Sequence, residues 1–521
     1  MKILRTYILI LFVVSAKCVM AQVTFQKKYY LSDATNGKSA QQTMDGGYII
    51  AGTTELAFGL SWEDICLIRT DEKGCVLWTS VFGGLSGDYT YSVRETSDRG
   101  FIVAGMTLSF GEGSWDILLL KTDSFGNILW SKTIGGAGDD RCYAIREVSD
   151  GGFILTGSTS SFGAGYYDIY LVRTDGLGNV LWSKTYGGSA GDYAYSIEET
   201  IDGGFIMTGE DQSFSIEGNV CLIKTDITGN VEWSKVYGGS NGDWGTSVMQ
   251  ALDGGYIIAG GTSSFSAYPK SDYYIIKTDQ IGNLIWSGMY GGSNYDNATS
   301  ICQTIDGGYL ISGNTVLEED GVYHCSIIKI DAFGNLLFSN TFGRIGYDYG
   351  DYYLQRTYDG GYIVVGTTVN YPESDRAIYL VKTDALANTG CDDNAVVHHM
   401  DIPDTQVNTP MTEVNQVESI VSSAELLVKS TTSNTSTVCY NENDTHYSLF
   451  VYPNPCIDQV LISGTGADGV LSIYTITGQL VYELPTNSFE TILNTASLTP
   501  GVYLIRYNNG SIEKYVKLIK N

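Results

Sequence analysis

The sequence repeats a short turn at a nearly constant interval, and this interval constrains the fold more than any other feature. The turn reads Asp-Gly-Gly followed by Tyr or Phe, with the variant Asp-Arg-Gly-Phe in the second copy. Successive copies start 51 to 53 residues apart, at Asp45, Asp98, Asp150, Asp202, Asp253, Asp306 and Asp359. Asp favours the start of a turn, and Gly supplies the positive φ that such turns need. The chain therefore contains seven copies of one structural unit.

Two further markers keep the same interval. An aromatic residue follows each Asp-x-x-Gly-Asn turn or its variant, and counting back 53 residues from Trp78 gives a seventh copy. These residues are Phe25, Trp78, Trp130, Trp182, Trp233, Trp286 and Phe338. A basic residue precedes each Thr-Asp or Ile-Asp pair, at Arg69, Lys121, Arg173, Lys224, Lys277, Lys329 and Lys382. We expect the aromatic residues to pack between neighbouring units and the basic residues to pair with nearby acids.

Each unit contains four short strands. In the copy that begins at Tyr195, the strands are YSIEET, FIMTG, NVCLIKTD and VEWSKVYGG. They are rich in β-branched and aromatic residues and are bounded by Gly, Asp and Asn. Four strands per period of roughly 50 residues is typical of propeller blades. A right-handed solenoid is the alternative, although solenoid coils are usually shorter.

The last unit lacks its fourth strand, and the beginning of the chain supplies a candidate for it. The segment VTFQKKYY, Val23 to Tyr30, resembles the fourth strand of the other units, such as LWSKTYGG at Leu181. Pairing the two ends of the array would remove its exposed sheet edges. The sequence therefore predicts an all-β fold with a seven-bladed propeller over residues 22–388, in which Phe25 lies beside the segment Ala377–Thr383.

Charge and the first residues indicate the compartment. The chain of 521 residues has 30 Lys and Arg against 58 Asp and Glu, a net charge of −28. Such a chain repels nucleic acid and anionic membranes, so we expect neither as a partner. Residues 1–21 carry Lys2 and Arg5 before the apolar run Tyr7–Val14, which predicts a secretory signal peptide. No later stretch is long and apolar enough to predict a transmembrane segment.

The composition changes after the repeats. Residues 389–445 are rich in Ser, Thr and Asn, and they lack the repeat markers. This composition predicts an extended or weakly β-structured linker. Cys391 and Cys439 flank the polar part of this segment, and a disulfide between them is one hypothesis.

The last segment, residues 446–521, has alternating apolar residues and frequent turns, which predict a small, Ig-like β-sandwich. Its most distinctive residues are Pro453, Asn454, Pro455, Gly478, Gly501, Val502 and Tyr503.

Both parts of the chain resemble known families. The turn repeats resemble the DGGY-type propeller repeats of exported Bacteroidetes proteins. The final segment resembles the type A C-terminal sorting domain of type IX secretion. The second resemblance implies that the outer-membrane type IX translocon is a partner. It also implies that the protein is released or attached to the outer surface.

The sequence offers few catalytic groups. It has four His, of which only His324 lies in the repeats, so neither a His-rich metal site nor a Ser-His-Asp triad is expected. Five acids recur ten residues before the next turn, and we expect them to cap backbone N–H groups. They are Asp88, Asp140, Asp192, Asp243 and Asp296. Ca²⁺ bound at these positions is a further hypothesis, and no other cofactor is expected.

The loops opposite the short turns are the best candidates for a binding surface. They carry aromatic residues among acids, which suits sugar rings or protein partners. The candidate contact residues are Trp62, Trp115, Tyr166, Trp244, Tyr295 and Tyr347. We therefore expect a surface protein that binds a glycan or a protein rather than an enzyme. The alternatives are a glycoside hydrolase with paired loop carboxylates, for which Glu318, Glu319 and Asp320 break the repeat, and a structural surface protein.

Overall fold

The structure is a computed structural model, and the described part of it consists of strands and turns without a helix. It describes residues 23–389 apart from 33, 56–62, 216, 267–269, 318–320, 343–347 and 370–374. It also describes five short segments between 398 and 429 and most of 450–520. The predicted signal peptide, Cys391 and Cys439 lie outside these residues.

Four consecutive antiparallel strands form the repeated unit. One sheet contains β6 (Asp88–Glu95), β7 (Phe101–Thr107), β8 (Asp116–Thr122) and β9 (Ile128–Gly135), paired in chain order. The Asp98 turn joins β6 to β7, and a second short turn joins β8 to β9. Both turns therefore lie on one face of the sheet array, which we call the short-turn face. The β7–β8 loop and the connection to the next sheet lie on the other face, the long-loop face.

The same order recurs in five further sheets, as expected of propeller blades. The first contains β2 (Thr35–Gln42), β3 (Tyr48–Thr54), β4 (Asp64–Thr70) and β5 (Val76–Gly83). The second contains β10 (Asp140–Glu147), β11 (Phe153–Thr159), β12 (Asp168–Thr174) and β13 (Val180–Tyr186). The third contains β14 (Asp192–Glu199), β15 (Phe205–Asp211), β16 (Asn219–Thr225) and β17 (Val231–Gly238). The fourth contains β18 (Asp243–Gln250), β19 (Tyr256–Thr262), β20 (Asp272–Thr278) and β21 (Leu284–Gly291). The fifth contains β22 (Asp296–Gln303), β23 (Tyr309–Val316), β24 (Tyr323–Ile330) and β25 (Leu336–Phe342).

The seventh sheet joins the two ends of the repeat array. It contains β26 (Asp348–Arg356), β27 (Tyr362–Val369), β28 (Arg376–Thr383) and β1 (Phe25–Tyr29), in the order β1-β28-β27-β26. Phe25 lies opposite Lys382 in this pairing, so the predicted pairing of the two segments is confirmed. The hydroxyl of Tyr29 donates to the carbonyl of Gly74 at 2.8 Å, as Tyr186 does to Gly229 at 2.7 Å. The N-terminal strand thus makes the contact that a fourth strand makes elsewhere.

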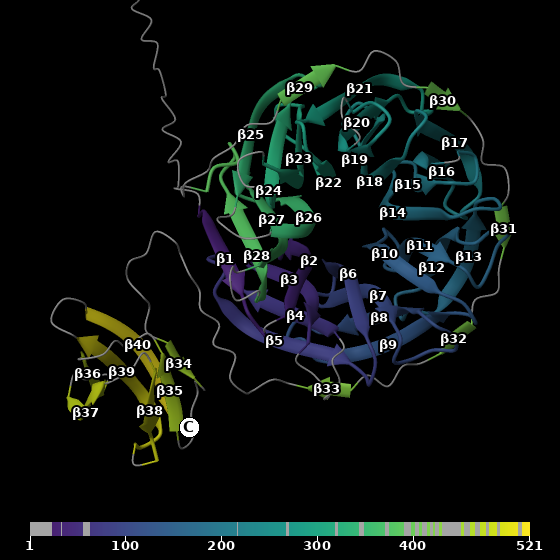
Figure 1. Cartoon of the computed structure of the whole chain (residues 1–521). Coiled ribbons are helices and arrows are strands. Elements are labelled where there is room, and N and C mark those ends of the chain that lie inside the picture. Colours follow the sequence, from purple (N-terminus) through teal and green to yellow (C-terminus); the bar gives the residue numbers. More distant parts are fainter. Residues whose placement is uncertain are drawn as a thin grey trace, which may run out of the picture.

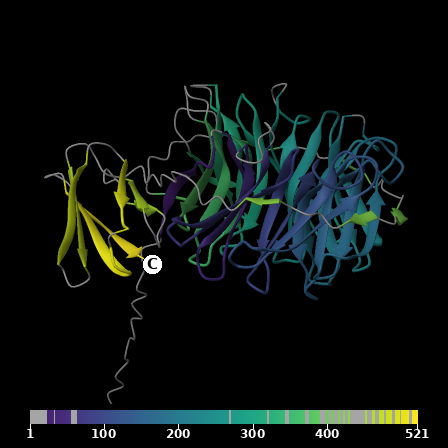
Figure 2. The same ribbon diagram turned by 90° about the horizontal axis from the view of Figure 1, so that it is seen from below.

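The sheets are arranged around a common centre (Figure 1). The first strand of each unit is innermost and the fourth is outermost, and the strands run from one face of the ring to the other (Figure 2). Hydrogen bonds tie neighbouring inner strands and turns together. Glu95 accepts from the backbone N–H of Met44 at 2.7 Å, and Gln42 accepts from that of Tyr358 at 2.7 Å. The second of these bonds links the first and seventh sheets.

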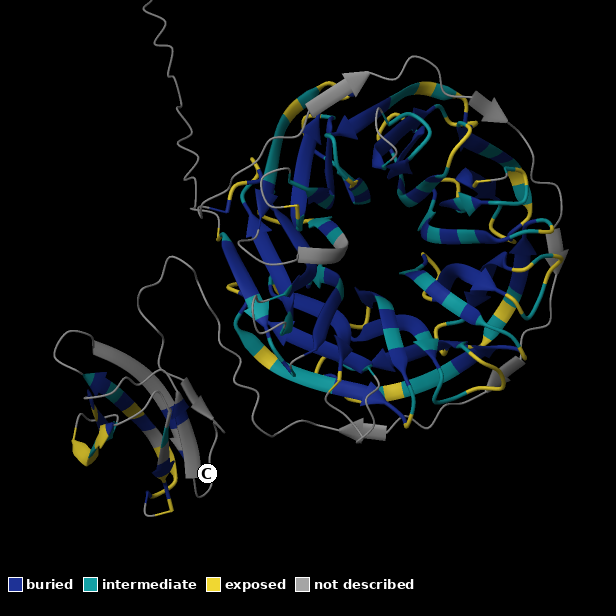
Figure 3. Ribbon diagram, viewed as in Figure 1, coloured by how far each residue is buried: buried dark blue, intermediate teal, exposed yellow. Residues whose placement is uncertain are grey.

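Aromatic residues of the fourth strands pack between neighbouring sheets, as predicted. Trp130 lies 6.2 Å from Phe153 of the next sheet, measured between ring centroids. It also lies against Gly178, whose φ is +74° and where a Cβ would be 2.7 Å from the indole ring. Five equivalent pairs have centroid distances of 5.6 to 6.4 Å: Phe25–Tyr48, Trp78–Phe101, Trp182–Phe205, Trp233–Tyr256 and Trp286–Tyr309. At the remaining boundary, Phe338 packs against a core that includes Tyr362. Most of the described strand residues are buried (Figure 3).

A buried cation supports each Asp-Gly-Gly turn, which confirms the predicted role of the periodic basic residues. Lys329, for example, donates to Asp306 at 2.8 Å, and this hydrogen bond helps to lower the pKa of Asp306 to about 2. Ion pairs of the same kind join Arg69 to Asp45, Lys121 to Asp98, Arg173 to Asp150, Lys224 to Asp202, Lys277 to Asp253 and Lys382 to Asp359. The basic residues therefore hold the turns and do not form a binding stripe.

The segment after the repeats runs back around the outside of the ring (Figure 1). Five short strands of this segment each pair with the outermost strand of one sheet. They are β29 (His398–Asp401) on β21, β30 (Gln406–Asn408) on β17, β31 (Val414–Gln416) on β13, β32 (Ile420–Ser422) on β9 and β33 (Leu427–Lys429) on β5. Such pairing covers backbone groups that an outer edge would otherwise expose.

The C-terminal segment forms two further sheets. One contains β34 (Phe450–Tyr452), β35 (Gln459–Ser463) and β38 (Glu490–Asn494), and the other contains β36 (Gly469–Thr475), β37 (Leu480–Thr486), β39 (Gly501–Asn508) and β40 (Glu513–Lys520). Ile462 and Leu493 of the first sheet share one core with Leu471 and Ile505 of the second. Tyr503 is buried, and its hydroxyl donates to the carbonyl of Thr499 at 2.8 Å. Pro453, Asn454, Pro455 and Gly478 lie outside the described residues.

Replacing Phe25 by Ala should destabilise the fold, because Phe25 belongs to the strand β1 that pairs the start of the repeat array with its end. The ring of Phe25 is buried and lies 5.9 Å from Tyr48 across a sheet boundary. Its loss should lower the free energy of unfolding by ~3–5 kcal/mol, measured from the shift in the denaturant midpoint. Val23→Ala is the control, because Val23 is exposed just before β1. Equal effects of the two substitutions would contradict the structural role of β1.

Candidate functional site at the centre of the ring

The inner strands place a group of tyrosines on one side of the ring centre. Tyr91, Tyr143 and Tyr195 occupy the same position in β6, β10 and β14, three residues after the initial Asp. The ring centroids of Tyr91 and Tyr143 are 5.2 Å apart, and those of Tyr143 and Tyr195 are also 5.2 Å apart. The equivalent residues of β2, β18 and β22 are Lys38, Thr246 and Thr299. Among these six inner strands, a tyrosine therefore occupies this position in three adjacent sheets.

Trp244 approaches the same centre from β18, nearer the long-loop face. Its indole ring lies over Gly261 of β19, where a Cβ would be 2.4 Å from the ring. The other units carry a side chain at this position, including Met106, Ser158 and Glu210. The absence of a side chain at residue 261 thus allows the large indole to lie against its own sheet.

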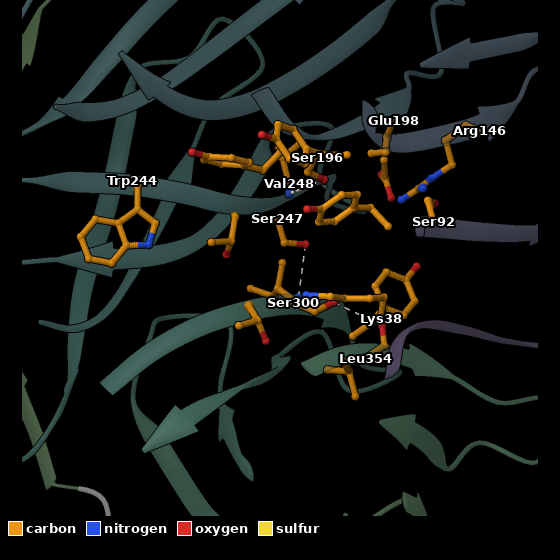
Figure 4. A pocket seen from close by; sticks show the side chains of 18 of the residues that line it. Lys38, Ser92, Arg146, Ser196, Glu198, Trp244, Ser247, Val248, Ser300 and Leu354 are labelled. Carbon is orange, nitrogen blue, oxygen red and sulfur yellow. Dashed lines mark hydrogen bonds between the residues drawn. The ribbon is translucent and has the colours of Figure 1, made fainter. Parts of the chain in front are cut away.

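These residues line a cavity of about 450 Å³. Figure 4 shows Trp244 on one side of it and Arg146 and Glu198 on the other. Ser and Thr residues of β18 and β22 complete the wall, and Glu210 of β15 also contributes to it. The volume lies within the range of small-ligand sites, roughly 300–1,000 Å³. The cavity combines aromatic surfaces with hydroxyl and charged groups, a composition suited to a polar ligand that contains rings.

Charged residues form the deep end of the cavity. Arg94 donates to the hydroxyl of Tyr353 at 2.6 Å and to the carbonyl of Val93 at 2.7 Å. Burial, followed by the nearby Arg146, lowers the pKa of Arg94 to about 10. Burial raises the pKa of Glu198, while Arg146 acts in the opposite direction. Arg94, Arg146 and Glu198 also line a second cavity of about 500 Å³, which lies towards the short-turn face.

The second cavity is a poorer candidate because its acidic and amide groups already hold the turns. Glu147 accepts from the backbone N–H of Ser97 at 2.8 Å, and Gln303 accepts from that of Leu252 at 2.9 Å. Both residues line this cavity. A ligand there would have to replace the hydrogen bonds that connect neighbouring sheets. The cavity near the long-loop face is therefore the candidate site.

The candidate aromatic residues from the sequence have different positions in the structure. Trp244 lines the cavity, whereas Trp115 is partly buried against Tyr89, with ring centroids 5.4 Å apart. Tyr166 is 73% exposed, and Tyr295 is 43% exposed. Trp62, Tyr347, Glu318, Glu319 and Asp320 lie outside the described residues. Of these four described candidates, Trp244 lines the cavity and Trp115, Tyr166 and Tyr295 do not.

A chain of tyrosines connects the exposed rim with the cavity. Tyr166 contacts Tyr167 at a centroid distance of 5.0 Å, and Tyr167 contacts Tyr193 at 5.5 Å. Tyr193 in turn lies parallel to Tyr195, with centroids 6.3 Å apart. Six residues of the cavity lining were not predicted from the sequence: Tyr91, Tyr143, Tyr195, Arg94, Arg146 and Glu198. Comparing equivalent positions of the seven inner strands could have found them, because these positions vary while the surrounding residues repeat.

The periodic acids beyond the cavity cap backbone groups, as predicted. Asp88 accepts from the backbone N–H of Gly84 and from the hydroxyl of Ser109, both at 2.8 Å. Asp140, Asp192, Asp243 and Asp296 accept equivalent bonds from Gly136, Gly188, Gly239 and Gly292 at 2.8 to 2.9 Å. Within the described residues, no group of three or more His, Cys, Asp or Glu side chains is placed to hold a metal ion. Ca²⁺ at these positions stays a hypothesis.

A second buried acid accompanies the capping acid at several sheet boundaries. Asp64, at the start of β4, and Asp88 both approach Gly83, where a Cβ would be 1.9 and 2.9 Å from their respective oxygens. Burial, followed by the charge of Asp88, raises the pKa of Asp64 to about 7. Asn219, at the start of β16, occupies the position equivalent to Asp64, and its neighbouring capping acid is Asp243. With its amide nitrogen turned towards Asp243, Asn219 donates to that carboxylate at 3.2 Å. A protonated Asp64 resembles this neutral amide.

Comparison with known families concerns the C-terminal segment. Residues 450–521 match the secretion system C-terminal sorting domain. This match indicates export by type IX secretion to the cell surface or the extracellular space, and it implies contact with the secretion machinery. No curated protein matches the chain. The described residues include no helix that could cross a membrane.

Solved structures with similarity to the chain include PorZ and Sqt1. PorZ, described as an essential surface component of the type IX secretion system of Porphyromonas gingivalis, has 11% identity and a TM-score of 0.35; the match covers 91% of this chain and 58% of PorZ. Sqt1 of Chaetomium thermophilum has 10% identity and a TM-score of 0.40, and the match covers 68% of this chain and 98% of Sqt1.

Replacing Asp64 by Asn should stabilise the protein at neutral pH. Because the folded-state pKa of Asp64 is raised from 3.8 to about 7, its contribution to stability is largest below pH 3.8 and decreases as the pH rises through 7. The neutral amide avoids this loss, so its advantage should grow between pH 4 and pH 8 to ~2 kcal/mol or more. Thermal unfolding across this pH range measures it. Glu72→Gln removes an exposed charge from the same sheet and is the control; a pH-independent difference for Asp64→Asn would contradict the prediction.

Proposed function

We propose that residues 23–389 form a closed seven-bladed β-propeller that is exported by type IX secretion and binds a glycan in its central cavity. The pairing of β1 with β28 and the hydrogen bond between Gln42 and Tyr358 support closure of the ring. The two C-terminal sheets around one core support a small β-sandwich that carries the export signal. In this proposal the propeller is the cargo and the sandwich directs its export.

The cavity lining is the observation that carries the binding function. Aromatic rings from β6, β10, β14 and β18 surround a space that also contains Ser and Thr hydroxyl groups. Sugar rings present C–H faces that pack on aromatic side chains, and their hydroxyl groups need hydrogen-bond partners. A protein partner would more often use a broad surface patch than a cavity at the centre of a ring. The lining therefore favours a glycan over a protein ligand.

Catalysis by paired carboxylates is the weaker candidate. Glu198 and Glu210 both line the cavity, and burial raises the pKa of each. However, Glu198 pairs with Ile206, which is four residues from Glu210 along β15. At about 3.4 Å per residue, the Cα atoms of the two acids are roughly 14 Å apart. Glycoside hydrolases place their carboxyl groups about 5–9.5 Å apart. Glu198 and Glu210 would reach this separation only if both side chains extended towards each other, and Glu210 instead accepts a hydrogen bond from Gln212 at 2.7 Å. Binding without hydrolysis is therefore the better proposal.

Removing residues 447–521 should prevent export. The truncated protein keeps all seven repeat sheets but lacks the segment that matches a sorting domain. We expect the propeller to remain in the periplasm, as measured by cell fractionation and by protease accessibility on intact cells. The full-length chain, expressed at the same level, is the control. Normal surface display or release of the truncated chain would refute the role of this segment.

Replacing Trp244 by Ala should weaken glycan binding ~5-fold, because a single aromatic contact contributes on the order of 1 kcal/mol. A glycan array would first identify a ligand of the intact propeller, and titration calorimetry would then compare the variants. Phe125→Ala is the matched control, since Phe125 is an exposed aromatic residue on the short-turn face. A wild-type propeller that binds no glycan would overturn the proposed function.

A further inference from the structure

Three cations face the candidate cavity from adjacent inner strands, although the whole chain carries a net charge of −28. Lys38 comes from β2, Arg94 from β6 and Arg146 from β10, and all three line the cavity. The acids of the lining, Glu198 and Glu210, both belong to the sheet of β14 and β15. The cavity therefore has one cationic side within a strongly acidic protein.

Arg94 has a fixed position at the deep end of this side. Its guanidinium donates to Tyr353, Val93 and Ser39 and lies 4.8 Å from the centre of the Tyr353 ring. These contacts account for its orientation and make it a supporting group. Its positive charge nevertheless contributes to the field in the cavity, because charges interact more strongly within a protein than in bulk water.

Arg146 is the better candidate for direct contact with a ligand. One nitrogen of its guanidinium donates to the carbonyl of Ile145 at 3.0 Å. The group has five N–H donors in a planar arrangement that matches a carboxylate. Figure 4 shows Arg146 beside Glu198 at one end of the cavity. Glu198 offsets one positive charge, but Arg94 and Lys38 leave this side cationic.

We infer that the glycan contains a uronic acid, whose carboxylate binds Arg146 while its sugar ring packs on Tyr143 and Tyr195. This inference rests on the proposed function and specifies its ligand class. Arg146 belongs to the same strand as Tyr143, and both residues line the cavity. Thr246 and Thr299 also line the cavity. Their hydroxyl groups donate to backbone carbonyls, so towards a ligand they act as acceptors for sugar hydroxyl groups. One site thus recognises both the acid group and the ring.

The first test compares ligands that differ only at the carboxyl group. The probes are oligomers of galacturonic, glucuronic and mannuronic acid, and the same oligomers after reduction of each carboxyl group to a primary alcohol. At least one acidic oligomer should bind the intact propeller ~10- to 100-fold more tightly than its reduced form, because a charge-assisted hydrogen bond is lost on reduction. This comparison needs no protein variant, so it does not depend on the folding of one.

The second test compares two single-charge variants with the wild type. Arg146→Gln should weaken binding of the acidic oligomer ~10- to 100-fold and leave binding of the reduced oligomer unchanged. Lys132→Gln removes the same charge from β9, where Lys132 bonds Asn179 at 2.8 Å outside the cavity lining, and should have little effect. Thermal unfolding of both variants checks that the fold is retained.

The outcomes separate this inference from the proposed function. Equal binding of acidic and reduced oligomers would overturn the uronic acid inference, while glycan binding itself would stand. Equal binding of a sulfated neutral oligomer would show a general anion site and would also overturn it. If neither acidic nor neutral glycans bind, both the inference and the proposed function fail. Selective binding that depends on Arg146 supports both.

Discussion

The hydrogen bonding of β1 to β28 connects the first and last residues of a repeat array more than 350 residues long. Without β1, the outer edge of the sheet of β26–β28 would expose a row of backbone donors and acceptors. Phe25 would also leave the space beside Tyr48, which it fills at the boundary between the seventh and first sheets. The arrangement of the inner strands, and hence the candidate cavity, depends on this contact between distant parts of the chain.

The periodic residues and the variable residues serve different purposes. Asp98 and Lys121, with their equivalents in the other units, hold turns, while Trp130 and its equivalents hold neighbouring sheets together. The cavity instead uses positions at which the units differ, such as Tyr143, Thr246 and Lys38. A ring of equivalent sheets can therefore present an asymmetric site, because equivalent positions meet at its centre and each can carry a different side chain.

Charge is distributed unevenly between the surface and the interior. Acids that pair with the buried cations of the turns, such as Asp306, keep their charge because the cation lowers their pKa. Burial, followed by the charge of Asp88, raises the pKa of Asp64 to about 7, so its neutral form is favoured below that pH. The lining of the cavity has three cations, Lys38, Arg94 and Arg146, against two acids, Glu198 and Glu210. A protein with a net charge of −28 can thus still offer a cationic site, because local geometry and not net charge sets the field in an enclosed space.

The sequence by itself determined the repeated unit, its four strands, the turn residues and the pairing of Phe25 with the last repeat. These features depend on local chemistry and on periodicity, both of which are visible along the chain. It also indicated Trp244 and the C-terminal sorting segment. Only the tertiary structure placed Arg146, Tyr143 and Tyr195 together with Trp244 around one cavity, because residues about 50 positions apart meet only when the sheets surround a common centre. The tertiary structure also showed that Trp115, Tyr166 and Tyr295, which the sequence suggested together with Trp244, do not line that cavity.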